Sequence, residues 1–234
     1  MIQSIRDDIM FERFELLVND KINEIKCKKI LVIGVGGVGS YTVESLIRSG
    51  IENITIIDND IIDITNLNRQ LMTTQDNIGL AKVDVLEKRI KSINPNCRVK
   101  SLKTFVDDTN IKDIINDYDY VVDACDTINT KLSIIKRCNE LKIKLICSMG
   151  TGNKMNPRLI EITDIYKTNY DPLAKIIRKE CRKMNIKKLT VVCSREIPIK
   201  KSIKTIPSNS FVPATAGLYI TSYIINDIVG DLHV

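Results

Sequence analysis

Short apolar runs alternate with amphipathic segments along much of this chain. The run 30–33 is apolar throughout and rich in β-branched residues, which is typical of a strand buried on both faces of a parallel sheet. Comparable segments predict further strands at 53–57, 98–102, 120–123 and 144–147. The pattern therefore begins with a series of strands that a sheet would bury.

The segments between these strands have helical spacing. Helices are predicted at 37–49, 79–93, 110–116 and 128–141. In the second of them, Val83, Leu86 and Ile90 form one apolar stripe, and Asn94-Pro95 ends the helix. Regular alternation of strand and helix predicts an α/β fold with a doubly wound, mostly parallel, Rossmann-like sheet and flanking helices.

The alternation stops at Gly150-Thr151-Gly152. Beyond it we expect late antiparallel strands at 159–163 and 189–194, helices at 171–184 and 214–229, and a mobile loop at 195–210. Segment 1–19 predicts an amphipathic helix, followed by a short second helix that ends near residue 25. The apolar face of the first helix would contain Ile5, Ile9, Phe14, Leu17 and Val18.

Composition narrows the class of protein. The 234 residues are 44% hydrophobic and 27% charged, which fits one globular domain. No run approaches the roughly 18 apolar residues of a membrane span, and no apolar signal core is visible, so we expect a cytoplasmic protein without membrane association. The seven cysteines contain no C-x-x-C pair, which predicts reduced thiols and argues against structural zinc. The only histidine is the penultimate residue, His233, which argues against catalysis by histidine.

The net charge of +6 is unevenly distributed. Segment 175–204 contains eleven Lys or Arg residues and only two acidic residues, Glu180 and Glu196. Such a segment suits a polyanionic partner, and it equally suits a solvated helix face followed by a loop.

A glycine-rich motif directly follows the first strand. Gly34, Gly36 and Gly39 have G-x-G-x-x-G spacing, in which the first glycine permits a tight turn, the second lets backbone approach a phosphate, and the third lets helix pack on strand. The N-terminus of the next helix would favour the phosphate. The motif predicts nucleotide binding but does not identify the nucleotide.

Charged residues follow the other predicted strands. Asp58 ends the second strand, where its carboxylate suits the ribose hydroxyls of ATP or NAD, and Asp60 is close enough to help. Arg69 and Lys82 suit phosphates, and Asp126 follows the fourth strand at the same sheet edge. Cations together with a free carboxylate favour Mg-ATP over a hydride cofactor.

Taken in order, five segments resemble the adenylation core of the ubiquitin-activating superfamily, which includes bacterial enzymes that activate sulphur-carrier proteins. They are Gly34-Val35-Gly36-Gly37-Val38-Gly39-Ser40, Asp58-Asn59-Asp60, Asn66-Leu67-Asn68-Arg69-Gln70, Gly79-Leu80-Ala81-Lys82 and Asp123-Ala124-Cys125-Asp126. The resemblance implies ATP and Mg²⁺ as cofactors and a homodimer. It implies a single adenylating domain over 1–234, with a helical segment at 1–27, a nucleotide-binding core at 28–152 and a substrate-binding part at 153–234.

The resemblance also implies roles for individual residues. The nucleotide would be held by Gly34, Gly36, Gly37, Gly39, Asp58, Asp60, Asn66, Arg69 and Lys82. Asp126 would serve Mg²⁺, and Arg69, Lys82 and Asp126 would carry the chemistry. Arg13 would reach into the neighbouring subunit's site.

Further segments resemble one branch of the superfamily, the tRNA threonylcarbamoyladenosine dehydratases. They are Arg48-Ser49-Gly50-Ile51, Ile93-Asn94-Pro95, Lys167-Thr168, Asp171-Pro172-Leu173 and Phe211-Val212-Pro213-Ala214. That resemblance implies ATP-dependent cyclisation of the threonylcarbamoyl group of a modified tRNA through an adenylated carboxylate, and a sulphur-transfer protein as a further partner.

Two alternatives stay open at this point. One is adenylation of the C-terminal glycine of a ubiquitin-like sulphur carrier, and the other is a non-catalytic or NAD-dependent module. On the tRNA hypothesis, the basic segment, with Lys200, Lys201 and Lys204, would contact tRNA phosphates at a distance from the nucleotide pocket. No catalytic thiol is required, although Cys125 and Cys193 are candidates; Cys147 is expected in the core.

Overall fold

The computed structural model describes residues 10–199 and 205–230. Within them lies a seven-stranded sheet of order β3-β2-β1-β4-β5-β7-β6, in which only the edge strand β6 runs antiparallel to its neighbour. The strands are β1 (Lys29–Ile33), β2 (Asn53–Ile57), β3 (Arg98–Leu102), β4 (Tyr120–Asp123), β5 (Lys144–Ser148), β6 (Ile160–Asp164) and β7 (Thr190–Ser194). The predicted α/β class and the doubly wound, mostly parallel sheet are confirmed.

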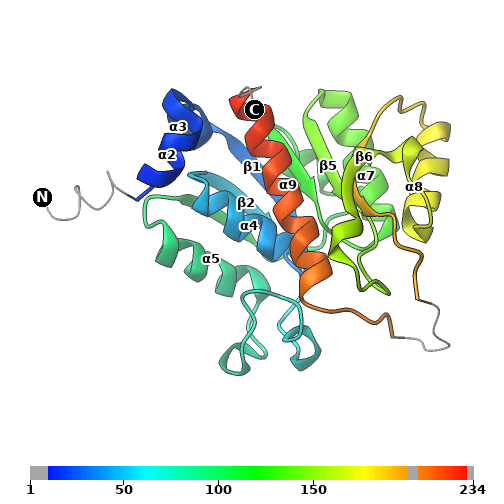
Figure 1. Ribbon diagram of the computed structural model, residues 1–234, viewed down its shortest axis with the longest axis horizontal. Coiled ribbons are helices and arrows are strands. Elements are labelled where there is room, and N and C mark those ends of the chain that lie inside the picture. The colour runs from blue at the N-terminus through cyan, green and yellow to red at the C-terminus, as the bar shows by residue number, and fades with distance from the viewer. Residues whose placement is uncertain (1–9, 200–204, 231–234) are drawn as a thin grey trace, which may run out of the picture.

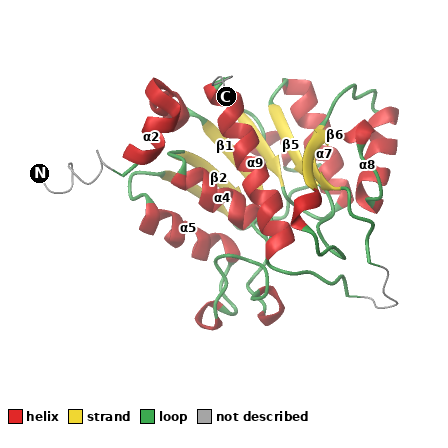
Figure 2. Ribbon diagram, viewed as in Figure 1, coloured by secondary structure: helices red, strands yellow, loops and turns green. Residues whose placement is uncertain are grey.

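Helices cover both faces of this sheet (Figures 1 and 2). They are α2 (Glu12–Val18), α3 (Ile22–Cys27), α4 (Gly39–Arg48), α5 (Lys82–Ile93), α6 (Ile111–Ile114), α7 (Ile128–Leu141), α8 (Pro172–Lys183) and α9 (Phe211–Val229). The long C-terminal α9 packs beside α4 on one face, and α6 and α7 lie on the other. Helix α8 packs against α7 near the β6–β7 edge.

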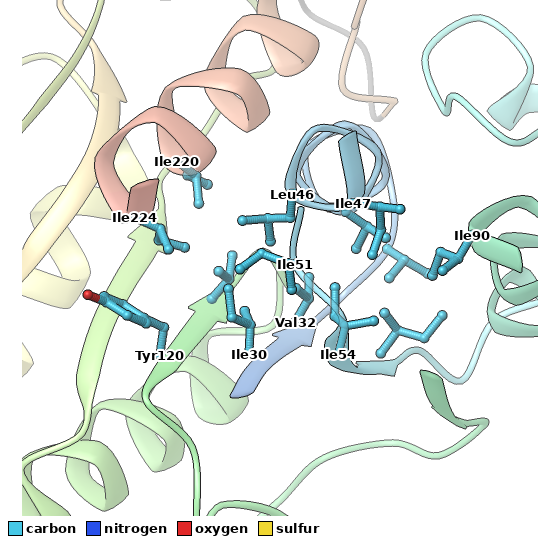
Figure 3. Packing of buried hydrophobic residues seen from close by; sticks show 14 of the residues in the cluster. Ile30, Val32, Leu46, Ile47, Ile51, Ile54, Ile90, Tyr120, Ile220 and Ile224 are labelled. Atoms are coloured by element: carbon cyan, nitrogen blue, oxygen red, sulfur yellow. The ribbon is translucent and has the colours of Figure 1, made fainter. Parts of the chain in front are cut away.

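The strand β1 shows why the sequence selects this arrangement. Ile30 and Val32 belong to the cluster under α4 and α9, whereas Leu31 and Ile33 belong to the cluster under α7. Successive side chains of a strand point to opposite faces, so an unbroken apolar run needs helices on both sides. Figure 3 shows the first cluster, in which Ile220 and Ile224 of α9 approach the side chains of β1.

Two helices begin later than the sequence predicts. Helix α4 begins at Gly39 rather than residue 37, because residues 37 and 38 still belong to the turn that precedes the helix. Helix α5 begins at Lys82 rather than residue 79, because Gly79 has a φ of +88° and belongs to the preceding turn. Both shifts lengthen the loops at the carboxyl edge of the sheet.

The late strands are found within one residue of their predicted bounds. Strand β6 pairs antiparallel with β7, but β7 itself runs parallel to β5, so only one strand departs from the parallel sheet. One continuous sheet therefore includes strands from both sides of residue 152.

The N-terminal prediction is only partly confirmed. Ile5 and Ile9 lie outside the described residues, and Phe14 and Val18 pack on the core as expected. Leu17, predicted on the same apolar face, does not pack on the core. Its side chain on α2 is 69% exposed, next to Leu16 at 78%. Within residues 10–199 and 205–230, no helix has the length and apolar character needed to cross a membrane.

Candidate active site

A cavity of about 760 Å³ lies at the carboxyl edge of the parallel strands. Chain segments that follow β1, β2, β4 and β5 line it. In this sheet order the chain leaves β1 toward β2 and later returns to β4 on the other side of β1, which makes this edge the topological switch point where doubly wound sheets bind ligands. The strand topology thus places the candidate residues around one volume.

The glycine-rich turn forms the floor of the cavity beside β1. Gly34 has a φ of +85°, and a Cβ there would lie 2.8 Å from the backbone of Ala124. A Cβ on Gly39 would lie 1.9 Å from the Gly34 carbonyl oxygen, so these two glycines allow α4 to pack on the turn. At Gly36 the nearest atom to such a Cβ is 3.7 Å away, which leaves room for a ligand.

The backbone of this turn is suited to an anion. Among the described residues, the amides of Gly36 and Gly37 donate to no protein acceptor. They lie at the N-terminal end of α4, where helix amides and the helix dipole favour negative charge. Gly34, Gly36 and Gly37 line the cavity, whereas Gly39 does not and acts through packing.

Asp58 is held in place by two backbone amides. Its Oδ2 accepts from the Val35 amide at 2.8 Å, and its Oδ1 accepts from the Asp60 amide at 2.9 Å. A carboxylate has about four lone-pair sites, so two further hydrogen bonds can be accepted from hydroxyls in the cavity. The geometry matches the predicted ribose-binding role.

Lys82 and Asp60 form an ion pair at the cavity wall. The ammonium of Lys82 lies 2.6 Å from Asp60 Oδ2, and its side chain is only 6% exposed, against 56% for that of Asp60. The Lys82 amide also donates to the Asp60 carbonyl at 3.1 Å. Asp60 therefore orients Lys82, and its nucleotide-binding role stays a prediction.

The next group of polar side chains lies in the turn Ile64–Asn66 and in the residues directly after it. Asn66 Oδ1 accepts from the Asp63 amide at 3.2 Å, which leaves the Asn66 Nδ2 group as the donor for a phosphate. Arg69 is steadied by bonds from Nη1 to the Thr65 carbonyl at 2.7 Å and to Asn68 Oδ1 at 2.9 Å. Gln70, which sequence reasoning missed as a site residue, lines the cavity with a buried Oε1 that has no partner.

Asp126 lies on the opposite side of the glycine turn, after β4. Its carboxylate is exposed and lines the cavity. Within the described part of the chain, no three His, Cys, Asp or Glu side chains gather into a metal site. A single carboxylate at this position suits a magnesium ion that takes its other ligands from phosphates and water.

The thiol next to Asp126 is a poor nucleophile. Cys125 lines the cavity, but burial and the neighbouring Asp123 carboxylate raise its pKa, so the thiol stays protonated near neutral pH. Burial likewise raises the pKa of Cys193 to about 11, and Cys147 is a core residue as expected. The site therefore offers charged groups and amides rather than a thiolate.

The far end of the cavity, after β5, contains a buried ion pair that the sequence did not reveal. Lys154 Nζ lies 3.0 Å from Asp171 Oδ2, and both side chains are at most 1% exposed. Asp171 also caps α8, because its Oδ1 accepts from the Ala174 amide at 2.9 Å. The break at Gly150-Thr151-Gly152 and the Asp171-Pro172 helix start were the local signals near this pair.

A segment close to the C-terminal helix covers this far end. Ile206 and Ser208 line the cavity, Asn153 donates to the Pro207 carbonyl at 2.8 Å, and Asn209 Nδ2 donates to the Lys154 carbonyl at 2.7 Å. Ile176 and Pro198 of segment 175–204 also line the cavity, at the end away from Asp58, and the tRNA contact of that segment stays a prediction. Residues on both sides of that segment's final loop line the same cavity.

Exposed basic side chains form a stripe along α8. Ala174, Ile177 and Cys181 are buried beneath the helix, and Ile176 lines the cavity near its start. The stripe consists of Lys175, Lys179, Arg182 and Lys183, all exposed and spaced for one helical face. Lys200, Lys201 and Lys204 lie outside the described residues.

Arg13, like Gly39, is a predicted site residue that does not line the cavity, and it lies on a different part of the chain. It is exposed on α2 and does not line the cavity of its own chain. In Figure 1, α2 lies near the N-terminal end of the described chain, far from the loops that enclose the cavity. Arg13 can therefore contribute only to the site of another copy.

Comparison with known proteins places this geometry in context. The ThiF family model matches residues 7–228. The tRNA threonylcarbamoyladenosine dehydratase of Bacillus subtilis (strain 168) is 39% identical over 245 residues, which cover 96% of each chain.

Solved structures of a dehydratase of the same kind have a similar fold. The E. coli tRNA N6-threonylcarbamoyladenosine dehydratase in complex with AMP superposes with a TM-score of 0.89 at 33% identity, covering 93% of this chain and 92% of that one. Its complex with ATP gives a TM-score of 0.87 at 34% identity, covering 93% of each chain.

Proposed function

The chain belongs to the ThiF family, and we propose that it is an ATP-dependent dehydratase that cyclises the threonylcarbamoyl group on a tRNA adenosine. The observation that carries this proposal is one cavity that joins a nucleotide-type end to a second, buried cationic end. The near full-length similarity to the Bacillus subtilis dehydratase supports the same conclusion.

The reaction has two balanced steps. A carboxylate oxygen of the threonylcarbamoyl group attacks the α-phosphorus of ATP, which forms an acyl–O–P bond and breaks the bond to pyrophosphate. A nucleophile within the same group then attacks the acyl carbon and loses a proton. AMP leaves with the electron pair of the C–O bond and carries away one carboxylate oxygen. One ring forms, and water is lost in the form of AMP and pyrophosphate.

The residues of the nucleotide end provide charge and position for the first step. Asp58 binds the ribose, and the amides of Gly36 and Gly37 bind phosphate oxygens. Asn66, Arg69 and Lys82 neutralise charge that builds up as pyrophosphate leaves. Each fixed donor of this kind raises the rate of the chemical step by on the order of a hundredfold or more, because it needs no rearrangement during the reaction.

Mg²⁺ fits the same end of the cavity. Asp126 presents an exposed carboxylate there, whereas Asp60 is already paired with Lys82. Bound to the phosphates, the ion would supply further charge neutralisation at the leaving pyrophosphate. Asp126 would hold it from the β4 side.

The α8 stripe supports an RNA substrate. Phosphate groups of an RNA backbone bind rows of basic side chains, and this row begins beside the cavity that would receive the modified base. The stripe runs from Lys175 to Lys183, about 12 Å along the helix, and Glu180 is its only acidic neighbour within α8.

A homodimer remains part of the proposal. Arg13 lies outside its own cavity, and Leu16 and Leu17 beside it are exposed apolar side chains on the same helix. A second copy that covers α2 would bury them and bring Arg13 to a neighbouring site. Light scattering at micromolar concentration tests this, since a monomer would contradict it. A sulphur-transfer partner stays a prediction.

The test of the proposed function is AMP formation with defined substrates. We expect AMP and pyrophosphate with threonylcarbamoyl-modified tRNA, and none above background with the same tRNA lacking the modification. AMP formation only with ubiquitin-like sulphur carriers would instead establish the alternative, activation of a C-terminal glycine. Purified protein containing stoichiometric zinc would also favour that alternative.

A further inference from the structure

Lys154 is a cation at the cavity that the adenylation chemistry described above does not use. Three basic side chains line the cavity within the described residues: Arg69 and Lys82 at the nucleotide end, and Lys154 alone at the far end. Lys154 is 3% exposed, so this is a built position rather than a surface lysine.

The hydrogen bonds of Lys154 fix it and leave one donor unused. Nζ donates to the Gly150 carbonyl at 2.6 Å and to Asp171 Oδ2 at 3.0 Å. An ammonium group has three N–H bonds, and no third acceptor is within reach in the part of the chain that the structure describes. Asp171 cannot swing away, because its other oxygen caps α8.

The backbone around the pair is costly to form. Asn153, directly before Lys154, has a φ of +59°, and Tyr170, directly before Asp171, has a φ of +61°. Asparagine adopts this left-handed conformation more readily than most residues, whereas an aromatic residue tolerates it poorly, so the cost falls on Tyr170. Buried ion pairs also contribute little net stability. Strain and burial together indicate a pair that is kept for a ligand.

The position of the pair along the sheet edge indicates which part of the substrate it meets. Asp58 follows β2, the glycine turn follows β1, Asp126 follows β4 and Lys154 follows β5. Neighbouring strands are about 4.8 Å apart, so β2 and β5 are separated by about 14 Å. Lys154 therefore lies beyond Asp126, on the side away from the ribose carboxylate.

The wall around Lys154 is largely apolar. Leu173, Ile176 and Ile206 line this end of the cavity. Asp171 offsets the charge of Lys154, so what the pair offers a carboxylate is the unused ammonium N–H, whose charge-assisted hydrogen bond is stronger in such surroundings than in water.

We propose that Lys154, held by Asp171, binds the substrate carboxylate that accepts AMP and orients it toward the α-phosphorus. This rests on the proposed function. Lys154 keeps its proton throughout: the carboxylate oxygen that attacks phosphorus forms the new P–O bond, and the ammonium donates a hydrogen bond to the same carboxyl group. Lys154 is thus a substrate-binding residue that distinguishes modified from unmodified RNA.

The experiment measures affinity for threonylcarbamoyl-modified tRNA and for the same tRNA without the modification, in the absence of ATP. We expect wild type to prefer the modified RNA by about tenfold or more, as for a desolvated charge-assisted hydrogen bond. In the double variant Lys154→Met/Asp171→Asn, which leaves no unpaired charge and retains a capping oxygen, this preference should disappear. Its affinity for unmodified RNA and for ATP should stay within about threefold of wild type.

A matched control separates substrate binding from loss of a buried pair. Lys131 and Asp123 form a second such pair, 3.0 Å apart with both side chains 0% exposed, and neither lines the cavity. Lys131→Met/Asp123→Asn removes a buried pair of the same kind and should keep the preference for modified RNA. Melting curves fix a temperature at which all three proteins are folded.

Two results would overturn the inference. In one, the Lys154→Met/Asp171→Asn variant retains the wild-type preference. In the other, wild type forms AMP with modified RNA but has no preference in affinity, which leaves the proposed function standing. Absence of AMP with modified RNA would instead contradict the proposed function itself.

Discussion

The two ends of the cavity are built in different ways. The nucleotide end uses local backbone features, namely the turn after β1, the amides that hold Asp58 and the start of α5 at Lys82. The far end uses a side-chain pair from two separate loops, Lys154 and Asp171, covered by a segment near α9. On the proposed function, the first end binds ATP, whereas the second meets the acyl group that is activated.

The largest effects should come from the nucleotide end. Arg69→Ala, Lys82→Ala and Asp126→Ala should each reduce the rate of AMP formation by on the order of a hundredfold or more, because each removes a fixed charge that acts on the phosphates. Steady-state kinetics with saturating modified tRNA measures this. Near wild-type turnover in all three variants would remove the proposed site.

Asp58→Ala should weaken ATP binding more than it slows chemistry. Its carboxylate is oriented by two amides toward the cavity, so its loss removes ribose contacts that ground state and transition state share. We expect KM for ATP to rise by about tenfold, with a smaller change in kcat. A large fall in kcat with unchanged KM would place Asp58 in the chemical step instead.

The α8 stripe should affect RNA and leave ATP alone. Replacing Lys175, Lys179 and Arg182 with Gln should reduce the slope of log affinity against log salt by roughly two units, at about 0.7 to 0.9 per lost phosphate contact. The titration is run with wild type and variant at several salt concentrations. Replacing Lys187 and Lys188, which follow the helix, shows how far the RNA track extends. An unchanged slope in the α8 variant means that RNA lies elsewhere.

The smallest effect should come from the thiol between the two ends. Burial and Asp123 raise the pKa of Cys125, so little thiolate forms as pH rises from 7 to 8. We expect Cys125→Ala to retain most activity. We also expect that the rate at which a thiol-alkylating reagent inactivates wild type does not rise over that pH range. Complete inactivation of the Ala variant, with an unchanged melting temperature, would reinstate a catalytic thiol.

The same contrast explains what the sequence could and could not predict. The strands and the nucleotide end depend on signals within short segments, such as the apolar run 30–33 and the glycine spacing after it. The bounds of helices α4 and α5 shifted because residues 37 and 38, and likewise Gly79, belong to the turns that precede these helices.

At the far end, the local signals marked the break after β5 and the start of α8, but not the ion pair that joins them. Lys154 and Asp171 are 17 positions apart, and neither sits in a motif that requires the other, so only the folded chain, which brings the start of α8 to the loop after β5, reveals the pair. Leu17 fails for a related reason. Helical spacing shows that a side chain shares an apolar face, but it does not show whether the same chain covers that face.

The central claim is that this cavity transfers AMP to the substrate's carboxylate, and oxygen labelling tests it most directly. Modified tRNA with ¹⁸O in the threonylcarbamoyl carboxylate is converted by wild type with unlabelled ATP, and the products are analysed by mass spectrometry. The account predicts one labelled oxygen in AMP for each cyclised product, because the carboxylate oxygen that attacks phosphorus leaves with it. Cyclised RNA accompanied by unlabelled AMP would contradict the account.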